Sequence, residues 1–304
     1  MARILDFAGW RFQSDFAIPG AVAVESATEA AADIVITGCP VPPAGGDGTG
    51  HPVWKVAPAG QVQLDLPGIG RFLIAEGCRV AVAPAPAANL HTIGFLLGGP
   101  VLAVLLRQRG LLPVDGAALG WETGALLLAG PSGQGKSLLA AALARKGWPV
   151  LGDGVLAVAP SASQPALIRC WPRLRLWQCG ARTLGIDISN YPPLRPGEAR
   201  VDTIWPEVGR APSLITGLVI VLNRASAPRC ERISPAQAVT KLAQSVWSRP
   251  AYADTPDGAA ALMRDLVSLA RGLPCWLLTP GEGLEAVGAT ADRLLETVSR
   301  PEGA

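Results

Sequence analysis

The stretch LLLAGPSGQGKSLLAAALARKGWPVLGDGVLAV, residues 126–158, decides the fold of this 304-residue chain. An apolar run leads into a glycine-rich turn, and an alanine- and leucine-rich segment follows the turn and ends at Gly147. This order predicts a buried strand, a helix and a second strand over 149–160, because helices commonly end at glycine and buried strands are short apolar runs. We therefore expect a βαβ-like unit and the α/β fold class.

The glycine-rich turn between the first strand and the helix fits the pattern G-x-x-x-x-G-K-[ST] without a gap. Its glycines allow backbone N–H groups to point at phosphate oxygens, and the helix that begins near Lys136 directs its positive end at the same place. Lys136 adds a charge for the β and γ phosphates, and Ser137 offers a hydroxyl to Mg²⁺. The residues expected to bind the nucleotide are Gly130, Ser132, Gly133, Gln134, Gly135, Lys136, Ser137 and Leu138.

A lone acid, Asp153, stands 17 residues after Lys136. A strand that returns beside the first strand would bring its carboxylate close to the phosphates, where it could hold Mg²⁺ or accept the proton of an attacking hydroxyl. The alternative is an aspartate in a turn, because Gly-Asp-Gly is a favourable turn composition. The glycine-rich turn alone leaves hydrolysis, phosphoryl transfer and regulated binding open. The chain has neither the N-K-x-D segment of a GTPase nor the Asp-Glu doublet of a mechanical ATPase.

The order of strand, GPSGQGKS, helix and VLGDGVLAV resembles the HPr kinase/phosphorylase family, and so does LPVDGAA at 112–118. The similarity is greatest to the divergent, longer HPr-kinase-like proteins with an additional N-terminal β domain, some of which phosphorylate a serine at the end of a lasso-peptide precursor. PRLRLW at 172–177 also resembles those proteins. The resemblance is clear over 92–180, weaker over 1–91 and slight after 180. It implies an HPr-kinase/PEP-carboxykinase-like P-loop kinase domain with ATP and Mg²⁺ as cofactors.

Three positions depart from the pattern of that family. The family has an A-D-D element after the helix, whose acids bind metal and activate the target serine; here the first acid is Asp153 and the second position is Gly154. A histidine usually stands where this chain has Asp115, and a glutamate where it has Leu138. Asp115 is a candidate proton acceptor or metal-side carboxylate, or else a strand-end aspartate that caps a turn. Loss of the second acid leaves room for a nucleotide-binding protein with little kinase activity.

Four arginines after the second strand are further candidates. Arg173 and Arg175 alternate with leucine in the strand expected at 170–177, so both face one side of it. They could contact phosphates or stabilise the transferring charge, or they could lie on a solvated face of the sheet. Arg195 and Arg200 occupy a proline-rich loop that could order over a substrate.

The whole chain predicts two domains, an N-terminal mainly antiparallel β domain over 1–90 and a P-loop kinase-like domain with C-terminal helices over 91–304. The first is expected from short alternating segments between turn residues, with a loop rich in Pro and Gly over 40–51. The strands expected there lie in ILDFAGWRF, AVAVES, DIVITG, PVWKVA, QVQLDLP, RFLIAEG and CRVAVAP. The later elements expected are strands at 170–177 and 215–222 and helices at 234–248, 257–271 and 283–298.

Composition argues against several classes of function. The net charge of +2 is too small for an electrostatic nucleic-acid or membrane surface. The longest uncharged apolar run, TIGFLLGGPVLAVLL at 92–106, is too short to span a bilayer and predicts a buried helix from after Pro100 to near Arg107. The six cysteines form no CxxC pair and match no zinc site, so free thiols in a reducing cytoplasm are expected. Asp6 and Arg11 break the first apolar run, so no signal peptide is predicted.

Together these observations predict an ATP- and Mg²⁺-dependent kinase that acts on a serine hydroxyl of a peptide or small protein, and the resemblance favours tailoring of a lasso-type precursor peptide. Asp153 or Asp115 would be the base, Ser137 and Asp153 would hold the metal, and Lys136 would hold the phosphates. The alternatives are a nucleotide sensor with a degraded active site, an HPr-type regulatory kinase and a P-loop ATPase. We expect no nucleic-acid or membrane partner, and the resemblance allows a homo-oligomer.

Overall fold

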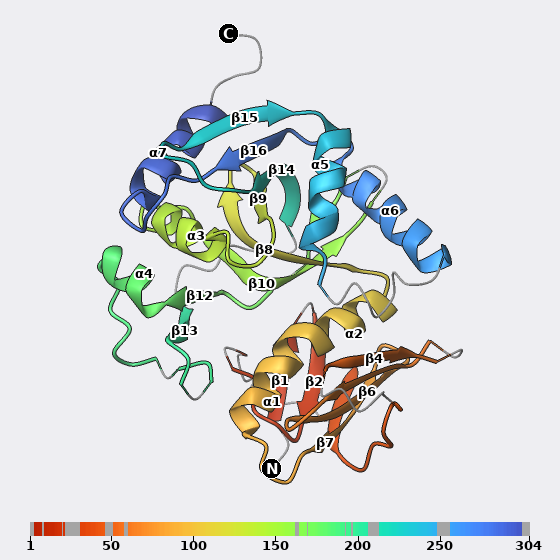
Figure 1. The fold of residues 1–304 in the computed structure, drawn as a ribbon. Coiled ribbons are helices and arrows are strands. Elements are labelled where there is room, and N and C mark those ends of the chain that lie inside the picture. Colours follow the sequence, from red (N-terminus) through yellow and green to blue (C-terminus); the bar gives the residue numbers. More distant parts are fainter. Residues whose placement is uncertain are drawn as a thin grey trace.

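A computed structural model describes residues 3–7, 9–19, 21, 31–45, 51–57, 60–161, 164–168, 170–191, 193–195, 197–205, 213–247 and 256–299. These residues form a mixed α/β structure with two seven-stranded sheets, a two-stranded ribbon and several helices (Figure 1). Both large sheets contain parallel and antiparallel pairs of strands. The α/β class and the C-terminal helices agree with the expectation from the sequence.

The N-terminal sheet has the strand order β1-β2-β3-β7-β6-β5-β4. Its strands are β1 (Arg3–Phe7), β2 (Trp10–Ser14), β3 (Ile34–Gly38), β4 (Val53–Val56), β5 (Val62–Leu66), β6 (Gly70–Ala75) and β7 (Arg79–Pro84). β3 runs parallel to both β2 and β7, whereas the other four pairs of neighbouring strands are antiparallel, so the sheet is mixed and mainly antiparallel, as the sequence predicts. The short connections give antiparallel hairpins, as between β6 and β7, whereas a long connection precedes β3. Except for Ala21, the expected strand AVAVES lies outside the described residues.

One long kinked helix connects the two large sheets and contacts both. It consists of α1 (Leu90–Leu96), a π-helical turn η1 (Leu97–Val101) and α2 (Leu102–Gln108). The expected helix start after Pro100 is wrong, because the helix begins at Leu90, where Asn89 Oδ1 accepts hydrogen bonds from the first N–H groups. Pro100 lies inside the helix, and the wider turn with a kink at Gly99 accommodates its ring and its missing N–H.

The kinked helix is longer than the uncharged run at 92–106. Its 19 residues, Leu90–Gln108, are long and apolar enough to cross a membrane by length and composition. The uncharged run in the sequence therefore underestimates the length of the apolar helix. However, 61% of the most apolar window is buried inside the protein, as in the core helix of a soluble protein. The helix is therefore weak evidence either way about a membrane.

The second sheet has the order β11-β10-β8-β9-β14-β16-β15. Its strands are β8 (Leu112–Trp121), β9 (Gly124–Ala129), β10 (Val150–Ala159), β11 (Ala166–Leu167), β14 (Ser213–Val221), β15 (Arg229–Ile233) and β16 (Cys275–Thr279). The predicted strand–helix–strand unit is β9, α3 (Lys136–Ala144) and β10. The expectation that the two strands are neighbours is wrong, because β8 lies between them and is antiparallel to both. β9, β14 and β16 are parallel, which brings their carboxyl ends to one edge of the sheet.

Helices cover both faces of the second sheet (Figure 1). The remaining helices and the two strands of the ribbon are α4 (Gln178–Thr183), α5 (Pro235–Leu242), η2 (Ala243–Ser245), α6 (Pro256–Ala270), α7 (Val287–Val298), β12 (Arg173–Trp177) and β13 (Arg200–Ile204). α3, α7 and β12 pack on one face, whereas α2, α5 and α6 pack on the other. The predicted helices at 234–248, 257–271 and 283–298 are confirmed as α5 with η2, α6 and α7.

One apolar core runs from the N-terminal sheet through the kinked helix to one face of the second sheet. Phe72 of β6, Leu105 of α2 and Leu127 of β9 all belong to it and are buried. A second core lies between the other face of the sheet, α3 and α7. The domain boundary expected at residue 90 stays a prediction, and shared packing joins the segments on its two sides.

Gly94 of α1 provides a test of how the kinked helix packs. A methyl group there would overlap the backbone carbonyl oxygen of Ala17, which cannot move aside as a flexible side chain can. Gly94→Ala is therefore expected to lower the free energy of unfolding by at least about 2 kcal/mol in urea denaturation. Gly288 of α7 is the matched control: a methyl there meets nothing within 4 Å, so Gly288→Ala should stabilise by about 0.5–1 kcal/mol. Equal stability of the two variants would contradict this packing.

Candidate functional site

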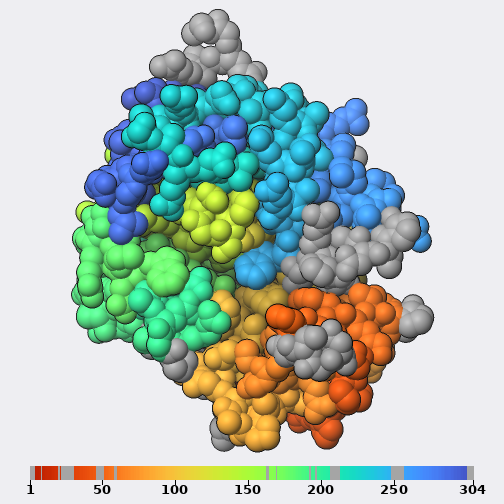
Figure 2. Space-filling model, viewed as in Figure 1, coloured from red at the N-terminus to blue at the C-terminus, as the bar shows by residue number. Residues whose placement is uncertain are grey.

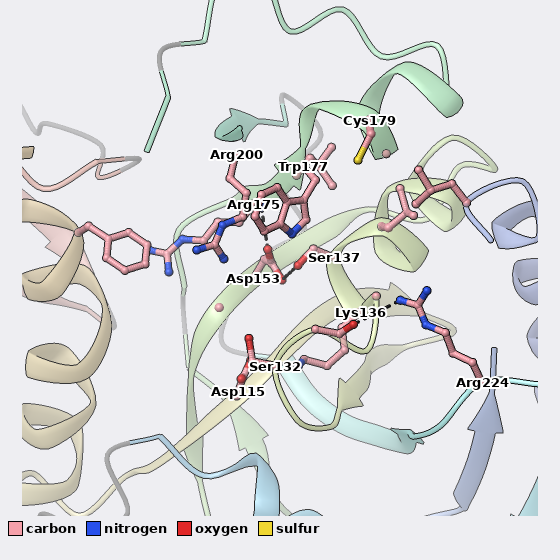
Figure 3. Close-up of a pocket in the computed structure, with 18 of the residues that line it drawn as sticks. Asp115, Ser132, Lys136, Ser137, Asp153, Arg175, Trp177, Cys179, Arg200 and Arg224 are labelled. Carbon is pink, nitrogen blue, oxygen red and sulfur yellow. Dashed lines mark hydrogen bonds and ion pairs between the residues drawn. The ribbon is translucent and has the colours of Figure 1, made fainter. Parts of the chain in front are cut away.

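A cavity of about 220 Å³ lies beside the phosphate loop, residues 130–137 (Figure 3). Its walls come from the loop, from strands β8, β10 and β12, and from Arg200 of β13. Arg224 after β14, Phe95 of α1, Trp247 after η2, Leu284 and two residues of α4 also line it. Segments that are far apart in the sequence therefore meet at this main cavity.

The phosphate loop has the conformation that its motif requires. Gly133 and Gly135 both have φ near +87°, where any other side chain would be strained, and Gly135 directly precedes α3. Because α3 begins at Lys136, the positive end of the helix is directed at the cavity. Of the predicted nucleotide-binding residues, those lining the main cavity are Ser132, Gly133, Gly135, Lys136, Ser137 and Leu138, whereas Gln134 lines a small adjoining cavity and Gly130 contacts Lys136.

Lys136 is buried and held by three oxygen atoms. Its Nζ donates to the carbonyl oxygens of Gly130 (2.7 Å) and Pro131 (2.9 Å) and forms an ion pair with Asp115 Oδ1 (3.2 Å). Asp115 is the fourth residue of the ten-residue strand β8, so its interpretation as a strand-end residue that caps a turn is wrong. Burial raises the pKa of Asp115, and the charge of Lys136 opposes this shift. A carboxylate of raised proton affinity thus lies next to the lysine of the phosphate-loop motif.

Asp153 lies inside β10, so its interpretation as a turn residue is wrong. Its side chain is buried, and both oxygens accept hydrogen bonds. Oδ1 accepts from Ser137 Oγ at 2.9 Å, and Oδ2 accepts from the backbone N–H of Arg175 at 2.7 Å. Because burial disfavours the charged form, the pKa of Asp153 rises to about 6. The predicted proximity of Asp153 to the phosphate loop is confirmed, although β10 is not the neighbour of β9.

Ser137 and Asp153 have the chemistry of a magnesium site that is shared with a nucleotide. Mg²⁺ prefers oxygen ligands, and it usually takes one or two from the protein and the rest from water and substrate phosphates. A hydroxyl and a carboxylate oxygen 2.9 Å apart beside the phosphate loop fit this pattern. In the described part of the chain, no group of three or more His, Cys, Asp and Glu side chains is placed to hold a metal. A metal at this site would therefore depend on the bound phosphates.

Arg173 and Arg175 face the same side of β12, as their spacing predicts, but that side is buried. Asp202 of β13 lies between them, with Oδ2 3.3 Å from Arg173 Nη1 and Oδ1 3.3 Å from Arg175 Nε. Both guanidinium groups also donate to the carbonyl oxygen of Gly98 in the π-helical turn, at 3.4 Å. The interpretation as a solvated sheet face is therefore wrong, since this pair attaches the ribbon to the kinked helix.

The backbone at Gly154 accounts for the departure from the two-acid pattern. Its φ of +91° lies in the left-handed region, and a Cβ there would stand 3.3 Å from Arg175 Nη1. The Gly154 carbonyl oxygen also accepts a hydrogen bond from Trp247 Nε1 at 3.0 Å. Where the resemblance expects a second carboxylate, this chain has a backbone conformation that disfavours side chains.

Several residues of the cavity were not expected from the sequence. Arg224 Nη2 donates to the carbonyl oxygen of Gly133 at 3.3 Å. The sequence contains an indication of this position, because Arg224 follows the predicted strand 215–222. Buried parallel strands bring their carboxyl ends, and the residues that follow them, to one edge of the sheet. Phe95 and Trp247 come from segments with no local motif, so only the tertiary structure places them at the cavity.

A scan of protein-family models finds none that matches the chain, and a search of curated proteins finds no match either. The function therefore has to be inferred from the site itself. The candidates for chemistry among the side chains that line the cavity are Asp115, Lys136, Ser137 and Asp153.

The raised pKa of Asp153 predicts a pH-dependent stability. The folded protein binds this proton more tightly than the unfolded chain, with a pKa of about 6 against 3.8, so the stabilisation is complete below the lower value and is lost as the pH rises through the higher one. In urea denaturation, Asp153→Asn should match the wild type near pH 4 and exceed it by on the order of 1–3 kcal/mol near pH 7.5. A difference that does not change with pH would contradict burial as the cause.

Gly154→Asp tests whether the second acid can be added. Backbone strain and the contact with Arg175 predict a loss of about 1–3 kcal/mol of unfolding free energy and no gain in nucleotide-dependent activity. Gly147→Asp is the matched control, because Gly147 has φ +92° but a Cβ there meets nothing within 4 Å. The control should be destabilised less. A stable and more active Gly154→Asp variant would show that this explanation is wrong.

Proposed function

We propose that the chain is an ATP- and Mg²⁺-dependent kinase that phosphorylates a serine hydroxyl of a peptide or small protein. The observation that carries the proposal is the position of Asp153, which accepts hydrogen bonds from Ser137 of the phosphate loop and from strand β12. The lining of the main cavity includes Arg175 and Phe95 as well as Asp153, and the acceptor would approach the phosphates from that side.

The phosphate loop and Lys136 hold the β and γ phosphates of ATP in this proposal. Lys136 exchanges its ion pair with Asp115 for phosphate oxygens, which releases the Asp115 carboxylate. Ser137 and Asp153 hold Mg²⁺, which neutralises phosphate charge when it is bound. Arg224 approaches the loop at Gly133 and supplies a further positive charge near the phosphates.

Two carboxylates are candidates for the base, and their contacts favour a division of roles. Both oxygens of Asp153 are engaged by donors, which suits a fixed metal ligand. Asp115 has a raised pKa and a partner that moves to the phosphates, which suits a proton acceptor. In the transfer step the acceptor oxygen bonds to the γ phosphorus, the bond to the ADP oxygen breaks, and the hydroxyl proton passes to Asp115.

The proposal also includes the domain organisation. An N-terminal β domain covers residues 1–90, and an HPr-kinase/PEP-carboxykinase-like P-loop kinase domain covers residues 91–304. The resemblance favours a lasso-type precursor peptide as the acceptor over the protein HPr. A cytoplasmic location, a homo-oligomer, and the absence of nucleic-acid and membrane partners are also part of it.

One observation favours a second function, a nucleotide sensor without transferase activity. Gly154 occupies the position of the second acid in the two-acid pattern, and its backbone conformation disfavours a side chain. A protein of this kind would bind ATP through the phosphate loop and respond with the ribbon that contacts Asp153. The distinction between the two functions is whether phosphate reaches an acceptor.

The test is mass spectrometry of serine-containing peptides, first those encoded beside the gene, after incubation with the protein, ATP and Mg²⁺. A gain of one phosphate is expected, and Lys136→Ala and Asp153→Asn should each reduce it by at least about 100-fold. Lys146→Ala is the matched control, because Lys146 is a surface residue paired with Asp292 at 2.8 Å, and it should keep full activity. Tight ATP binding without transfer would favour the sensor, and phosphate release without an acceptor would favour an ATPase.

Asp115→Asn separates the proposed base from the nucleotide site. Transfer should fall by at least about 100-fold, because Asp115 is proposed to act on the hydroxyl proton. The affinity for ATP should stay near that of the wild type or rise, because the ion pair of Asp115 with Lys136 competes with the phosphates. Equal losses in transfer and ATP affinity would instead assign Asp115 to nucleotide binding. The measurement is the rate of peptide phosphorylation at saturating ATP, with ATP affinity determined by calorimetry.

A further inference from the structure

The main cavity has two ends with different chemistry. In Figure 3, Arg224 lies on one side of Ser137 and Asp153, and Arg175 and Arg200 lie on the other. Asp153 Oδ1 accepts from Ser137 of the phosphate loop, whereas Oδ2 accepts from the backbone N–H of Arg175. The proposed kinase reaction uses the phosphate-loop end and assigns no ligand to the arginine end.

Arg173 and Arg175 share one carboxylate, that of Asp202, with both ion pairs at 3.3 Å. The carboxylates of Asp153 and Asp115 also interact electrostatically with the Arg175 guanidinium, although Asp153 accepts its hydrogen bond from the backbone N–H of this residue. In the proposed reaction these two carboxylates serve the metal and the acceptor proton, so an anion at this end of the cavity would take over their compensation of the Arg175 charge.

A second group, from the loop before β13 and the first residue of that strand, again shares one carboxylate between two arginines. Glu198 forms ion pairs with both Arg195 and Arg200, which leaves one positive charge in excess. The guanidinium of Arg200 stands 5.0 Å from the ring centroid of Trp177 and lines the main cavity. This group therefore adds an excess positive charge on the side of the cavity away from Arg224.

Aromatic rings surround these charges. Arg175 lies 4.9 Å from the ring centroid of Phe95, and Trp177 and Trp247 also line the cavity. Trp177 is 52% exposed, and its ring lies beside the Arg200 guanidinium at the mouth of the cavity. Rings stacked on guanidinium faces limit the mobility of the arginines. Asp202 and Gly98 engage Arg175, and Glu198 engages Arg200, which uses part of the five N–H donors of each guanidinium.

We propose that the arginine end of the cavity binds a carboxylate of the acceptor, next to the hydroxyl that receives the phosphate. The proposal rests on the kinase function and narrows the acceptor to a serine with a free terminal carboxylate or a serine beside an acidic side chain. Arginine suits this role, because its planar fork matches the two oxygens of a carboxylate. A carboxylate held by Arg175 and Arg200 leaves the acceptor hydroxyl facing Asp153 and the phosphates.

An adjoining groove gives room for the rest of a peptide. This groove, of about 700 Å³, shares Trp177 with the main cavity and is also lined by Ile69 after β5, Thr92 of α1 and Arg195. Figure 2 shows the green surface of the ribbon beside the golden surface of α1 at this place. The N-terminal sheet and α1 therefore form one wall of a path that ends at the arginine end of the cavity.

The test uses the full-length protein with ADP and Mg²⁺ and three probes that carry a serine hydroxyl: N-acetylserine, N-acetylserinamide and N-acetylaspartylserinamide. Ligand-observed NMR measures the dissociation constant of each probe. One of the two carboxylate probes is expected to bind at least about tenfold more tightly than N-acetylserinamide, and Arg200→Gln should remove that preference. Arg182→Gln is the matched control, because it removes an exposed arginine of the adjacent helix α4 and should keep the preference.

A preference for N-acetylserine would show that the site binds the terminal carboxylate of the acceptor. A preference for the aspartyl probe would show that it binds an acidic side chain beside the serine. Arg175→Lys keeps the charge but loses the fork, and its melting temperature shows whether it folds. Equal affinity for all three probes, or a preference that survives both arginine variants, would overturn the proposal. If the probes bind with the expected preference but no serine peptide gains phosphate, the result contradicts the kinase function alone. If phosphate is transferred at equal rates to peptides with a free carboxylate and to their amides, the result supports the kinase function and contradicts the carboxylate site.

Discussion

The carboxylate of Asp153 is the interaction on which the rest of the site depends. It is buried where loss of water opposes its charge, and two donors hold it, the Ser137 hydroxyl and the backbone N–H of Arg175. These donors belong to α3 and to the ribbon, and the carboxylate itself comes from the second sheet. One side chain therefore fixes three parts of the fold relative to each other, at the place where a nucleotide would bring its charge.

The ribbon that receives Asp153 is held in turn by buried ion pairs. Asp202 links Arg173 and Arg175, and both arginines donate to the Gly98 carbonyl oxygen in the π-helical turn. Arg173 also donates to the carbonyl oxygen of Pro19 in the N-terminal segment. A buried charge that loses its partner raises the free energy of the folded protein, so these contacts resist separation of the ribbon from the kinked helix. A continuous set of contacts thus runs from the N-terminal part of the chain to Asp153.

Local sequence predicts the phosphate loop well, because its glycines, lysine and serine act through backbone conformation and a helix end that neighbouring residues determine. It does not predict which strands pair, so the insertion of β8 between β9 and β10, and with it the position of Asp115 inside a strand, could not be foreseen. The alternation of Arg173 and Arg175 gives their common side but not its burial, since Asp202 and Gly98 are distant in sequence. Pro100 misleads for a similar reason: a π-helical turn keeps it inside a helix.

The proposed role of Asp153 as a metal ligand is tested most directly by calorimetric titration of ATP with and without Mg²⁺, in the wild type and in Asp153→Asn. If Asp153 and Ser137 hold the metal, Mg²⁺ should raise the affinity of the wild type for ATP by at least about tenfold and should raise that of the variant much less. The affinity for metal-free ATP should be similar in the two proteins, because the phosphate loop and Lys136 are unchanged. An equal effect of Mg²⁺ in both proteins would contradict the proposal and make Asp153 a structural acid alone.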